Sequence, residues 1–518
     1  STHMADGYAR ATGKVGVCVN TSGPGATNMI TGLATAYMDS TPIVAISGQV
    51  PTGLLGRDGF QESDVFGISM PVTKHNYLIT DIRELPMALK EAFHIARTGR
   101  PGPVLIDVCK DVQQDSMEFE YPAEVDLPGY HPNQNEPDPS AVERAAKLLN
   151  EADRPLIIAG QGVSIAKAER ELRQLAEVAN IPVATSLLGI GTLPGTHPLS
   201  ISWGGMHGEA YTNFAMQECD VMLAIGARLD DRLTGAFETF APKARIIHAD
   251  LDPAEMNKNL TIDTPVVGDA LLTLRELITH VQPNEHPAWI EQIEAWKADS
   301  SERDILAQET DELIAPYVVR ELWHATNEGD CTVVSDVGQH QMWEAQYFRH
   351  TKRRSLLTSG GLGTMGYALP AAIGAQLGHP EEEIWVIAGD GGFQMTMNEL
   401  STVVQERLPV KIAIINNGFL GMVRQWQQLF YDERYSEVHL QPNLPDYKML
   451  AEAMGCEGIR VESPEEVQPA IERANEIDDR PVVIDFRTEP SENVYPMVPA
   501  GKSNSDVIVH PSQEETRP

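Results

Sequence analysis

The order of apolar and polar positions along the chain predicts blocks in which buried strands alternate with helices. In residues 1–121, unbroken apolar runs lie at 15–20 (VGVCVN), 42–46 (PIVAI) and 103–108 (PVLIDV), each beside glycine or proline. Such runs are typical of parallel strands that are covered on both faces. Helix-like periodicity fills the intervals, as in residues 26–37. This first block is therefore expected to be an α/β domain.

Two further blocks, residues 140–281 and 312–496, show the same alternation. Their strand-like runs are short and apolar, and lie at residues 155–159, 221–225, 245–250, 332–335, 384–388, 410–415 and 481–485. Strands that alternate with helical patterns predict a parallel sheet with helices on both faces. The expected fold class is α/β, with three doubly wound parallel-sheet domains.

The segments between and after these blocks differ in composition. Residues 122–139 are rich in proline and are expected to form a linker, whereas the acidic, helix-prone residues 282–306 are expected to form a second connector. Residues 497–518 are assigned to a C-terminal tail, of which the polar part from residue 502 onward is expected to be mobile.

The first and third blocks share a faint internal repeat. A glycine-rich turn at residues 22–28 (SGPGATN) precedes a helix and the strand at 42–46, and a turn at 389–393 (GDGGF) precedes a helix at about 397–405 and the strand at 410–415. The two blocks are therefore expected to share a fold, with the central block inserted between them. The alternative is that any two strand–helix–strand units look alike, because few such connections are favoured.

Composition excludes several classes of function. The 518 residues carry a formal net charge of −35, which disfavours binding to nucleic acid or to an anionic membrane. No apolar run approaches the length that crosses a bilayer. The cysteines are scattered, without the spacing of a zinc site or a disulfide framework, so a reducing cytoplasm is the expected location.

The most informative chemistry lies at the ends of two consecutive predicted strands. Asp390, within Gly389-Asp390-Gly391, follows the strand at 384–388, and Asn417 follows the strand at 410–415. The carboxyl ends of parallel strands share one edge of a sheet, where such sheets bind ligands. An aspartate and an amide oxygen suit Mg²⁺, and glycines at a helix start suit a phosphate. The residues alone predict a Mg²⁺–diphosphate site, the alternative being two unrelated turns.

Further motifs narrow the class. They combine glycines with charged or aromatic residues, and lie at 56–62 (GRDGFQE), 73–77 (TKHNY), 99–103 (GRPGP), 107–111 (DVCKD), 205–208 (GMHG), 230–235 (DDRLTG), 338–343 (GQHQMW), 360–366 (GGLGTMG) and 421–426 (GMVRQW). In this order, and with the Asp390 and Asn417 pair, they resemble the catalytic large subunit of acetohydroxyacid synthase (acetolactate synthase), a thiamine-diphosphate enzyme. The resemblance covers nearly the whole chain.

The resemblance implies a reaction, cofactors and partners. Pyruvate would be decarboxylated on thiamine diphosphate, and the hydroxyethyl group would be ligated to pyruvate or 2-ketobutyrate, giving 2-acetolactate or 2-aceto-2-hydroxybutyrate. These products begin branched-chain amino acid biosynthesis, toward valine and isoleucine. The cofactors would be thiamine diphosphate, Mg²⁺ and an FAD without net redox role. The assembly would be a homodimer or homotetramer with a small regulatory subunit.

The resemblance also implies domain roles and cofactor contacts. The first block would bind the pyrimidine of thiamine diphosphate, the central block FAD, and the third block the diphosphate. Asp390, Asn417 and the carbonyl of Phe419 would bind Mg²⁺. The thiamine-diphosphate contacts would be Gly23, Gly25, Gly338, Gln339, His340, Gly363, Met365, Gly391, Gly392 and Met422. Met365 would hold the two rings of the cofactor in a bent form, although methionines at such positions also serve as ordinary core.

The resemblance also implies a set of FAD contacts, for which the sequence has no strong motif of its own. They are Arg100, Gly160, His207, Arg228 and Asp250. A Gly-x-Gly sequence after a strand is weak evidence by itself, and His207 could equally be a structural histidine.

The implied catalytic residues are Gln61, Lys110, Arg232, Met365 and Trp426. Arg232 would bind the carboxylate of the second ketoacid, because a guanidinium offers a two-pronged donor; the alternative is an ion pair with Asp230 or Asp231. Trp426 would form an apolar wall that favours the extra methyl of 2-ketobutyrate. Phe60, Gln61 and Lys110 would reach the substrate from a partner subunit, although Lys110 could be a plain solvated lysine.

One element of the family pattern is expected to be missing, so that the first domain is incomplete at its start. In the family, a glutamate that bonds the pyrimidine N1′ precedes the segment found here at residues 1–10, and Glu62 belongs to another motif. Three explanations stay open: a truncated product of an ordinary enzyme, which the other site residues favour; a catalytically impaired cofactor-binding paralogue; or numbering that begins late. Another thiamine-diphosphate decarboxylase or oxidase of 2-ketoacids is the alternative activity.

Overall fold

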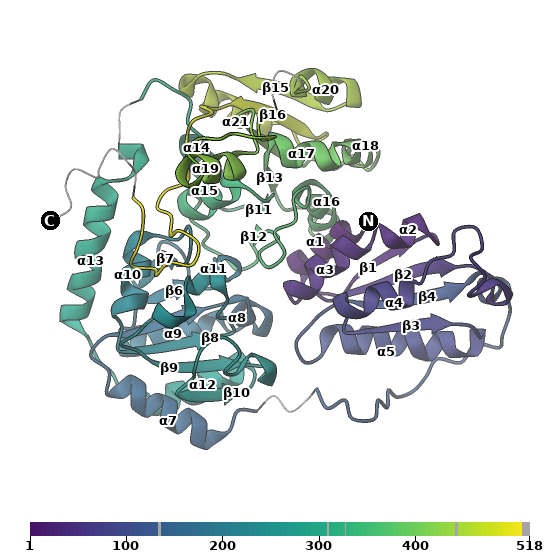
Figure 1. The fold of residues 1–518 in the computed structure, drawn as a ribbon, viewed down its shortest axis with the longest axis horizontal. Helices are drawn as coiled ribbons and strands as arrows, with labels where there is room; N and C mark the ends of the chain where they lie inside the picture. Colours follow the sequence, from purple (N-terminus) through teal and green to yellow (C-terminus); the bar gives the residue numbers. More distant parts are fainter. Residues whose placement is uncertain (133–135, 308–309, 327, 441–443, 510–518) are drawn as a thin grey trace.

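The structure is a computed structural model that describes residues 1–132, 136–307, 310–326, 328–440 and 444–509, and it contains three parallel sheets (Figure 1). The first sheet has the order β1-β2-β4-β3, with strands Gly16–Asn20 (β1), Ile43–Gln49 (β2), His75–Ile79 (β3) and Val104–Cys109 (β4). Its helices are Thr2–Thr12 (α1), Pro24–Thr27 (α2), Ile30–Met38 (α3), Val65–Ser69 (α4), Leu85–Arg97 (α5) and Lys110–Gln114 (α6).

The second sheet has the order β10-β9-β8-β5-β6-β7. Its strands are Pro155–Ala159 (β5), Val183–Thr185 (β6), Ser200–Trp203 (β7), Val221–Ile225 (β8), Arg245–Asp250 (β9) and Thr264–Val267 (β10). Its helices are Pro139–Asn150 (α7), Gln161–Ala166 (α8), Glu169–Ala179 (α9), Ala210–Glu218 (α10), Asp231–Thr234 (α11), Ala270–His280 (α12) and Pro287–Glu302 (α13).

The third sheet has the order β12-β11-β13-β14-β16-β15. Its strands are Thr332–Ser335 (β11), Leu356–Leu357 (β12), Ile384–Gly389 (β13), Lys411–Asn416 (β14), Glu457–Val461 (β15) and Val482–Arg487 (β16). Its helices are Ala315–Ala325 (α14), Gln339–Tyr347 (α15), Ala368–Gly378 (α16), Asp390–Thr396 (α17), Leu400–Gln405 (α18), Gly421–Phe430 (α19), Tyr447–Met454 (α20) and Val467–Asn475 (α21).

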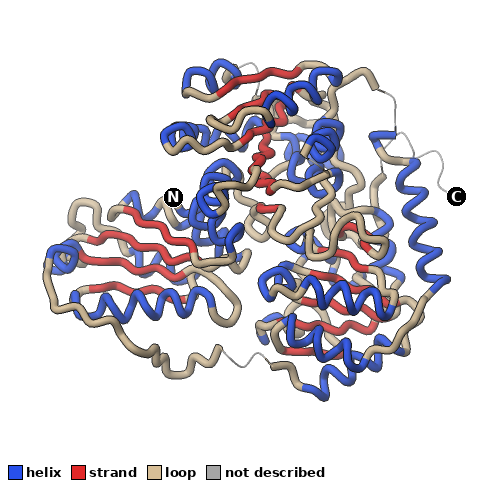
Figure 2. The backbone as a smooth tube through the Cα atoms, turned by 180° about the vertical axis from the view of Figure 1, so that it is seen from behind, coloured by secondary structure: helices blue, strands red, loops and turns tan. Residues whose placement is uncertain are grey.

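Each sheet carries helices on both faces, which confirms the predicted fold class (Figure 2). The run at 15–20 is an exception to the expected burial on both faces, because Val17 and Val19 of the edge strand β1 are 48% and 65% exposed. In β5, Ile157 belongs to one apolar core and Ile158 to the core on the other face. In β13, Val386 and Ile387 divide in the same way. Successive side chains of a strand point to opposite faces, so burial on both faces produces the unbroken apolar runs of the sequence.

The first domain is attached to the third through a close helix crossing. The Cβ that an alanine would add at Gly7 of α1 would lie 1.9 Å from the carbonyl oxygen of Ala371 in α16. A Cβ at Gly374 of α16 would lie 1.8 Å from the carbonyl oxygen of Met4. Neither position tolerates a side chain, so glycine lets the two helix backbones touch and joins the domains.

Several strands were not expected from the sequence, namely β3, β6, β7, β10, β12 and β15. Most lie at or beside sheet edges, where part of the strand stays exposed. The alternating burial of Thr264–Val267 in β10 is an example. A strand that buries only part of its surface does not need a continuous apolar run, so the pattern used for prediction was absent there.

Two predicted segments need correction. The helix expected at about 397–405 begins earlier, as α17 at Asp390, and reaches α18 through a 3-10 turn at Met397–Glu399. The segment 282–306 is more than a connector, because Trp289 and Ile293 of α13 are buried in a core of the central domain. The expected linker contains no helix or strand over its described residues before α7 begins at Pro139; residues 133–135 lie outside the described part.

The C-terminal tail is bonded to the central domain over its described part, residues 497–509, so the mobility expected from residue 502 onward is wrong for residues 502–509. The backbone amide of Val498 donates to the Met206 carbonyl (2.8 Å), and that of Ala236 donates to the Lys502 carbonyl (2.9 Å). Asn504 is fully buried and donates to the Leu233 carbonyl (3.0 Å). Backbone groups and the side chain of Asn504 thus pair this segment with the central domain. Across the described ranges, none of the helices has the length and apolar character of a membrane span.

Candidate active site

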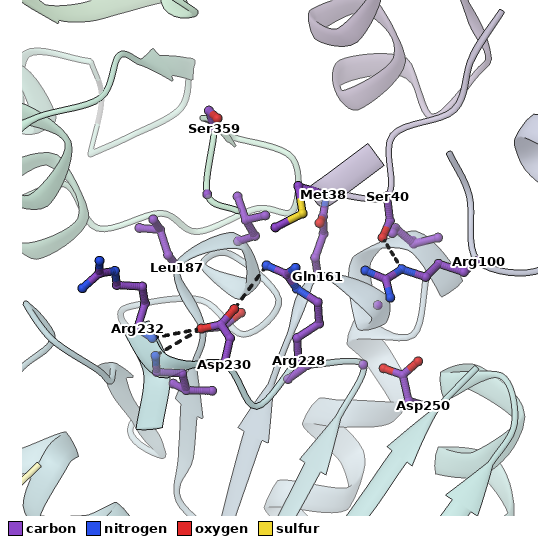
Figure 3. Close-up of a pocket in the computed structure, with 18 of the residues that line it drawn as sticks. Met38, Ser40, Arg100, Gln161, Leu187, Arg228, Asp230, Arg232, Asp250 and Ser359 are labelled. Carbon is purple, nitrogen blue, oxygen red and sulfur yellow. Dashed lines mark hydrogen bonds and ion pairs between the residues drawn. The ribbon is translucent and has the colours of Figure 1, made fainter. Parts of the chain in front are cut away.

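A cavity of about 700 Å³ lies where the three domains meet (Figure 3). The central domain contributes residues that follow the carboxyl ends of its strands, including Gln161 after β5, Gly226 after β8 and Gly268 after β10. This edge is where open α/β sheets bind ligands. The first domain contributes Met38, Ser40 and residues 97–101, which precede its strands, and the third domain closes the remaining side.

Close glycine contacts shape the floor of the cavity. A Cβ at Gly160 would lie 2.1 Å from the Gly226 carbonyl oxygen, and a Cβ at Gly162 would lie 2.6 Å from the Gly226 Cα. The loops after β5 and β8 therefore touch through bare backbone, and α8 starts directly at the cavity. Gly160, predicted to contact FAD, makes this packing contact and is not part of the cavity lining, whereas its neighbours Gln161 and Gly162 line the cavity.

The other predicted FAD contacts, Arg100, His207, Arg228 and Asp250, all line the cavity. The guanidinium of Arg100 is already paired, with Glu255 at 2.7 Å and Asp252 at 3.2 Å. Burial raises the pKa of Asp250. One oxygen of this carboxylate accepts from the Asp252 amide (2.8 Å). The second oxygen of Asp250 is the group that could accept from a ligand hydroxyl.

Buried polar atoms without a protein partner also face this region. Trp203 Nε1 and His207 Nδ1 have no hydrogen-bond partner among the described residues, although both side chains are buried and line the cavity. Burial, and then the charge of Arg232, lower the pKa of His207 to about 4, so the imidazole is neutral. A buried polar atom without a hydrogen-bond partner lowers the stability of the fold, and a bound polar ligand would supply the missing partner. The cavity thus fits a large nucleotide such as FAD.

Arg232 lines the cavity from the start of α11, and its guanidinium points away from Asp230 and Arg228 (Figure 3). The Asp230 carboxylate accepts from the backbone amides of Arg232 and Leu233, at 3.2 and 3.3 Å, and pairs with the guanidinium of Arg228 at 3.2 Å. The Arg232 guanidinium approaches Asp231 only at 3.9 Å, with both side chains largely exposed. The ion pair considered as the alternative role of Arg232 is therefore long and weak.

The third domain places Met422 and Trp426 on the same cavity, together with Gly338 and Gly363. Trp426 lies on α19 and packs edgewise on Phe430, with ring centres 5.3 Å apart. Trp426 and Arg232, which are far apart in the sequence and come from different domains, thus share one chamber. The guanidinium of Arg232 is held by two weak contacts, to Met206 Sδ at 3.3 Å and to Asp231 at 3.9 Å. Its pairing with an apolar wall suits a small carboxylic acid that carries an alkyl group.

The predicted metal ligands lie at the carboxyl ends of the neighbouring strands β13 and β14. The two oxygens of Asp390 accept from the amides of Gly391 (2.9 Å) and Gly418 (2.8 Å). Burial raises the pKa of Asp390 to about 7, which a cation would reverse. Asn417 Oδ1 accepts from the Phe419 amide at 3.1 Å. No group of three or more histidine, cysteine, aspartate or glutamate side chains forms a metal site within the described ranges, so any metal here would take amide, carbonyl and ligand oxygens.

The predicted diphosphate residues lie next to Asp390 and Asn417, and together these residues form what we call the diphosphate corner. Gly338 caps α15, and the His340 ring lies under it, with Nε2 buried and without a partner among the described residues. Burial lowers the pKa of His340 to about 3. The Gln339 side chain accepts from Asn417 Nδ2 at 3.2 Å, which links the segment after β11 to the end of β14. Bare backbone, a helix start and an orphaned imidazole fit a phosphate group.

Three more predicted cofactor residues close this corner. Gly391 and Gly392 lie in the first turn of α17, and a Cβ at Gly391 would lie 3.9 Å from the Met365 Cε. A Cβ at Gly392 would lie 2.9 Å from Asp336 Oδ1. Met365 therefore lies over the start of α17, and the glycines leave no room for side chains.

Apart from Arg100, the predicted residues of the first domain lie elsewhere, at the carboxyl edge of its sheet. Gly23 follows β1, Lys110 follows β4, and a Cβ at Gly23 would lie 2.9 Å from the Gln61 Cα. Gly25 stands in the same turn, and Phe60 is 90% exposed. The first domain offers its opposite edge, with Met38 and Ser40, to the cavity of its own chain. Within one chain, Gln61 and Lys110 are not brought to Arg232.

Sequence reasoning missed several residues of the cavity. Gly226 follows β8 as Gly160 follows β5, so the rule that flagged Gly160 could have flagged Gly226. Trp203 of the lining carried no pattern of its own, and neither did Asp39, which stands behind the lining residues Met38 and Ser40 and accepts from the Gly361 amide.

Three parallel-sheet domains, with Asp390 and Asn417 at the carboxyl ends of neighbouring strands of the third, match the class of thiamine pyrophosphate (TPP) enzymes. Family models agree: the N-terminal TPP binding domain matches residues 1–68, the central domain residues 142–277, and the C-terminal TPP binding domain residues 336–486. More particularly, the chain belongs to the family of acetolactate synthase large subunits. The resemblance inferred from the motifs is confirmed.

The relatives match over nearly the whole chain. The chain is 50% identical to the acetolactate synthase large subunit of Corynebacterium glutamicum over 513 residues, covering 98% of this chain and 82% of the relative. It is 48% identical to the acetolactate synthase of Mycobacterium bovis over 513 residues, covering 98% and 83%. It is 45% identical to the acetolactate synthase large subunit of Parasynechococcus marenigrum over 531 residues, covering 99% and 83%.

Proposed function

We propose that this chain decarboxylates pyruvate and ligates the two-carbon unit to a second 2-ketoacid. Pyruvate as acceptor gives 2-acetolactate, and 2-ketobutyrate gives 2-aceto-2-hydroxybutyrate. The observation that carries the proposal is that Arg232 and Trp426 share one cavity with Gly338, the entrance to the diphosphate corner. The names of the relatives support the same activity.

Within this proposal each side chain has a defined task. Arg232 binds the carboxylate of the acceptor ketoacid through its two-pronged donor. Trp426 bounds the alkyl side of the acceptor and favours the longer chain of 2-ketobutyrate. Asp390, Asn417 and the Phe419 carbonyl hold Mg²⁺ against the diphosphate.

The cofactor contacts complete the assignment. Gly338, Gln339 and His340 receive the diphosphate, and His207, Arg228 and Asp250 contact FAD. When bound, thiamine diphosphate supplies the electron sink that the decarboxylation requires.

The proposed assembly is a homodimer or a pair of dimers. Gly23, Gln61 and Lys110 lie on the edge of the first domain that faces away from the cavity of their own chain. A second copy that brings this edge to the diphosphate corner would complete a site, with Phe60 and Lys110 reaching the substrate. The words "large subunit" in the names of relatives support a small regulatory partner.

The test is a product assay with Mg²⁺, thiamine diphosphate, FAD and pyruvate, comparing the unsubstituted protein with Arg232→Gln. Loss of a charge-assisted pair of hydrogen bonds, about 1.5–3 kcal/mol, should lower kcat/KM for the acceptor roughly 10–150-fold. Arg275→Gln is the control, because Arg275 pairs with Glu171 on the surface at 3.0 Å. Acetaldehyde or peroxide in place of acetolactate would assign the chain to a decarboxylase or oxidase, and an unchanged Arg232→Gln variant would remove Arg232 from the site.

A further inference from the structure

The loop between β12 and α16 is held at both ends by buried carboxylates that belong to different domains. Asp336, which follows β11, accepts from the backbone amides of Gly366 (2.9 Å) and Ala368 (3.3 Å). Asp39 of the first domain accepts from the amides of Gly361 (2.7 Å) and Gly360 (3.0 Å). The third domain thus anchors one end of the loop, and the first domain anchors the other.

Asp39 is itself fixed by a buried guanidinium. Arg10 Nη2 bonds Asp39 Oδ2 at 2.7 Å, and both side chains are at most 4% exposed. Arg10 also bonds Asp6 Oδ1 (2.5 Å) and donates to the Thr358 carbonyl (2.9 Å), and Tyr367 donates to Asp6 (2.6 Å). Arg10 is shared by two carboxylates, so both depend on its one positive charge, and Asp6 Oδ2 is buried without a hydrogen-bond partner among the described residues. Such a network holds one geometry, because moving any member would leave a buried charge unpaired.

The held loop is a wall of the cavity. Ser359, Gly360 and Gly363 line it from the third domain, and Met38 and Ser40, the neighbours of Asp39, line it from the first (Figure 3). The same loop carries Met365.

All three domains meet on Gly361. A Cβ there would lie 2.7 Å from Asp39 Oδ1 and 3.0 Å from both the Met38 Cβ and Arg228 Nη2. The bare backbone of Gly361 is therefore what lets Asp39 and Arg228 approach the loop together.

We propose that Asp39, held by Arg10, is a positioning residue for the cavity. Its carboxylate fixes Gly360 and Gly361, so that the loop stands against Arg228 and completes the wall on which the flavin nucleotide binds. The first domain then contributes to cofactor binding in its own chain through the amino edge of its sheet. The inference rests on the proposed function in its FAD assignment.

The experiment compares Asp39→Asn with the unsubstituted protein in two measurements at a temperature well below unfolding. Asparagine has a similar shape, but it turns an N–H group toward one of the two amides it should accept from, or toward Arg10. The first measurement is hydrogen–deuterium exchange of the backbone amides of residues 358–366. The second is the affinity for FAD by fluorescence titration. Exchange of Gly360 and Gly361 should accelerate about tenfold or more, and FAD affinity should fall about tenfold.

Gly361→Ala is the second variant. It removes no charge, but its methyl group would displace the loop from Asp39 and Arg228. It should reproduce the loss of FAD affinity, and it keeps the proposal testable if Asp39→Asn does not fold. Glu382→Gln is the matched control, because Glu382 bonds Lys352 (2.8 Å) and Thr332 (2.7 Å) at the amino edge of the third sheet, away from the cavity. It should lower thermal stability and leave both measurements unchanged.

The two measurements distinguish a failure of the FAD assignment from a failure of the positioning role of Asp39. If the unsubstituted protein does not bind FAD, the FAD assignment fails, and exchange of residues 358–366 still decides whether Asp39 holds the loop. Unchanged exchange in Asp39→Asn would overturn the positioning role. Unchanged FAD affinity in Asp39→Asn and in Gly361→Ala, beside normal binding by the unsubstituted protein, would overturn it as well and leave Asp39 as a purely structural contact between domains.

Discussion

Replacing Asp336 by asparagine should change the pH dependence of stability in a defined direction. Asp336 is 1% exposed, and burial raises its pKa from 3.8 to about 6, against the hydrogen bonds from the amides of Val337, Gly366 and Ala368. The folded state therefore binds the proton more tightly than the unfolded state. Between these two pKa values the folded state holds more protons, so this group makes stability fall as pH rises.

The magnitude follows from the shift. A difference of about 2.2 pH units corresponds to about 3 kcal/mol lost above pH 6, of which roughly 1.4 kcal/mol falls between pH 5.0 and 7.5. Asparagine does not titrate. It keeps one acceptor oxygen for Val337 and Gly366, bonded at 2.7 and 2.9 Å, and turns its N–H group toward the Ala368 amide. Loss of the hydrogen bond from the Ala368 amide lowers the free energy of unfolding by about 1–3 kcal/mol at every pH.

The assay is thermal unfolding of both proteins without cofactors at pH 5.0 and pH 7.5. Between pH 5.0 and pH 7.5, the Tm of Asp336→Asn should rise by roughly 3–6 °C relative to the Tm of the unsubstituted protein. The reason is that 1 kcal/mol shifts the Tm of a domain of this size by about 2–4 °C. Glu382→Gln is the control. Although burial opposes it, the bonds from Lys352 and Thr332 lower the pKa of Glu382 below 4.5, so its contribution is constant over this range. A difference for Asp336→Asn that stays constant, or that falls as pH rises, would refute the reasoning.

Two further predictions concern the chemistry. Trp426→Leu should lose about 1–2 kcal/mol of preference for 2-ketobutyrate over pyruvate, a roughly 5–30-fold change in product ratio under competition, while still making acetolactate; an unchanged ratio would leave Trp426 as core. Asp390→Ala removes the charged member of the proposed metal set and should abolish Mg²⁺-dependent binding of thiamine diphosphate in calorimetric titrations. Retention of the unsubstituted affinity by that variant would show that the metal assignment is wrong.

The strands at the centre of each sheet could be predicted from sequence, and so could the Asp390 and Asn417 pair. Central strands such as Ile384–Gly389 are buried on both faces, so every position must be apolar and the run is visible in one dimension. The geometry of parallel sheets then brings the two strand ends together without further information. Edge strands such as Glu457–Val461 were missed because partial burial leaves no such run.

The tertiary structure alone decided how the domains share one chamber. Arg232 and Trp426 meet there because loops from different domains converge on the carboxyl edge of the central sheet. Asp39 and Arg10 gave no local signal, since a buried carboxylate and guanidinium have meaning only through the distant amides and carbonyls that they satisfy. Hydrophobic periodicity reports whether a residue is buried, which is a local property. The identity of a partner across a domain boundary depends on how whole domains pack, and no spacing along the chain encodes it.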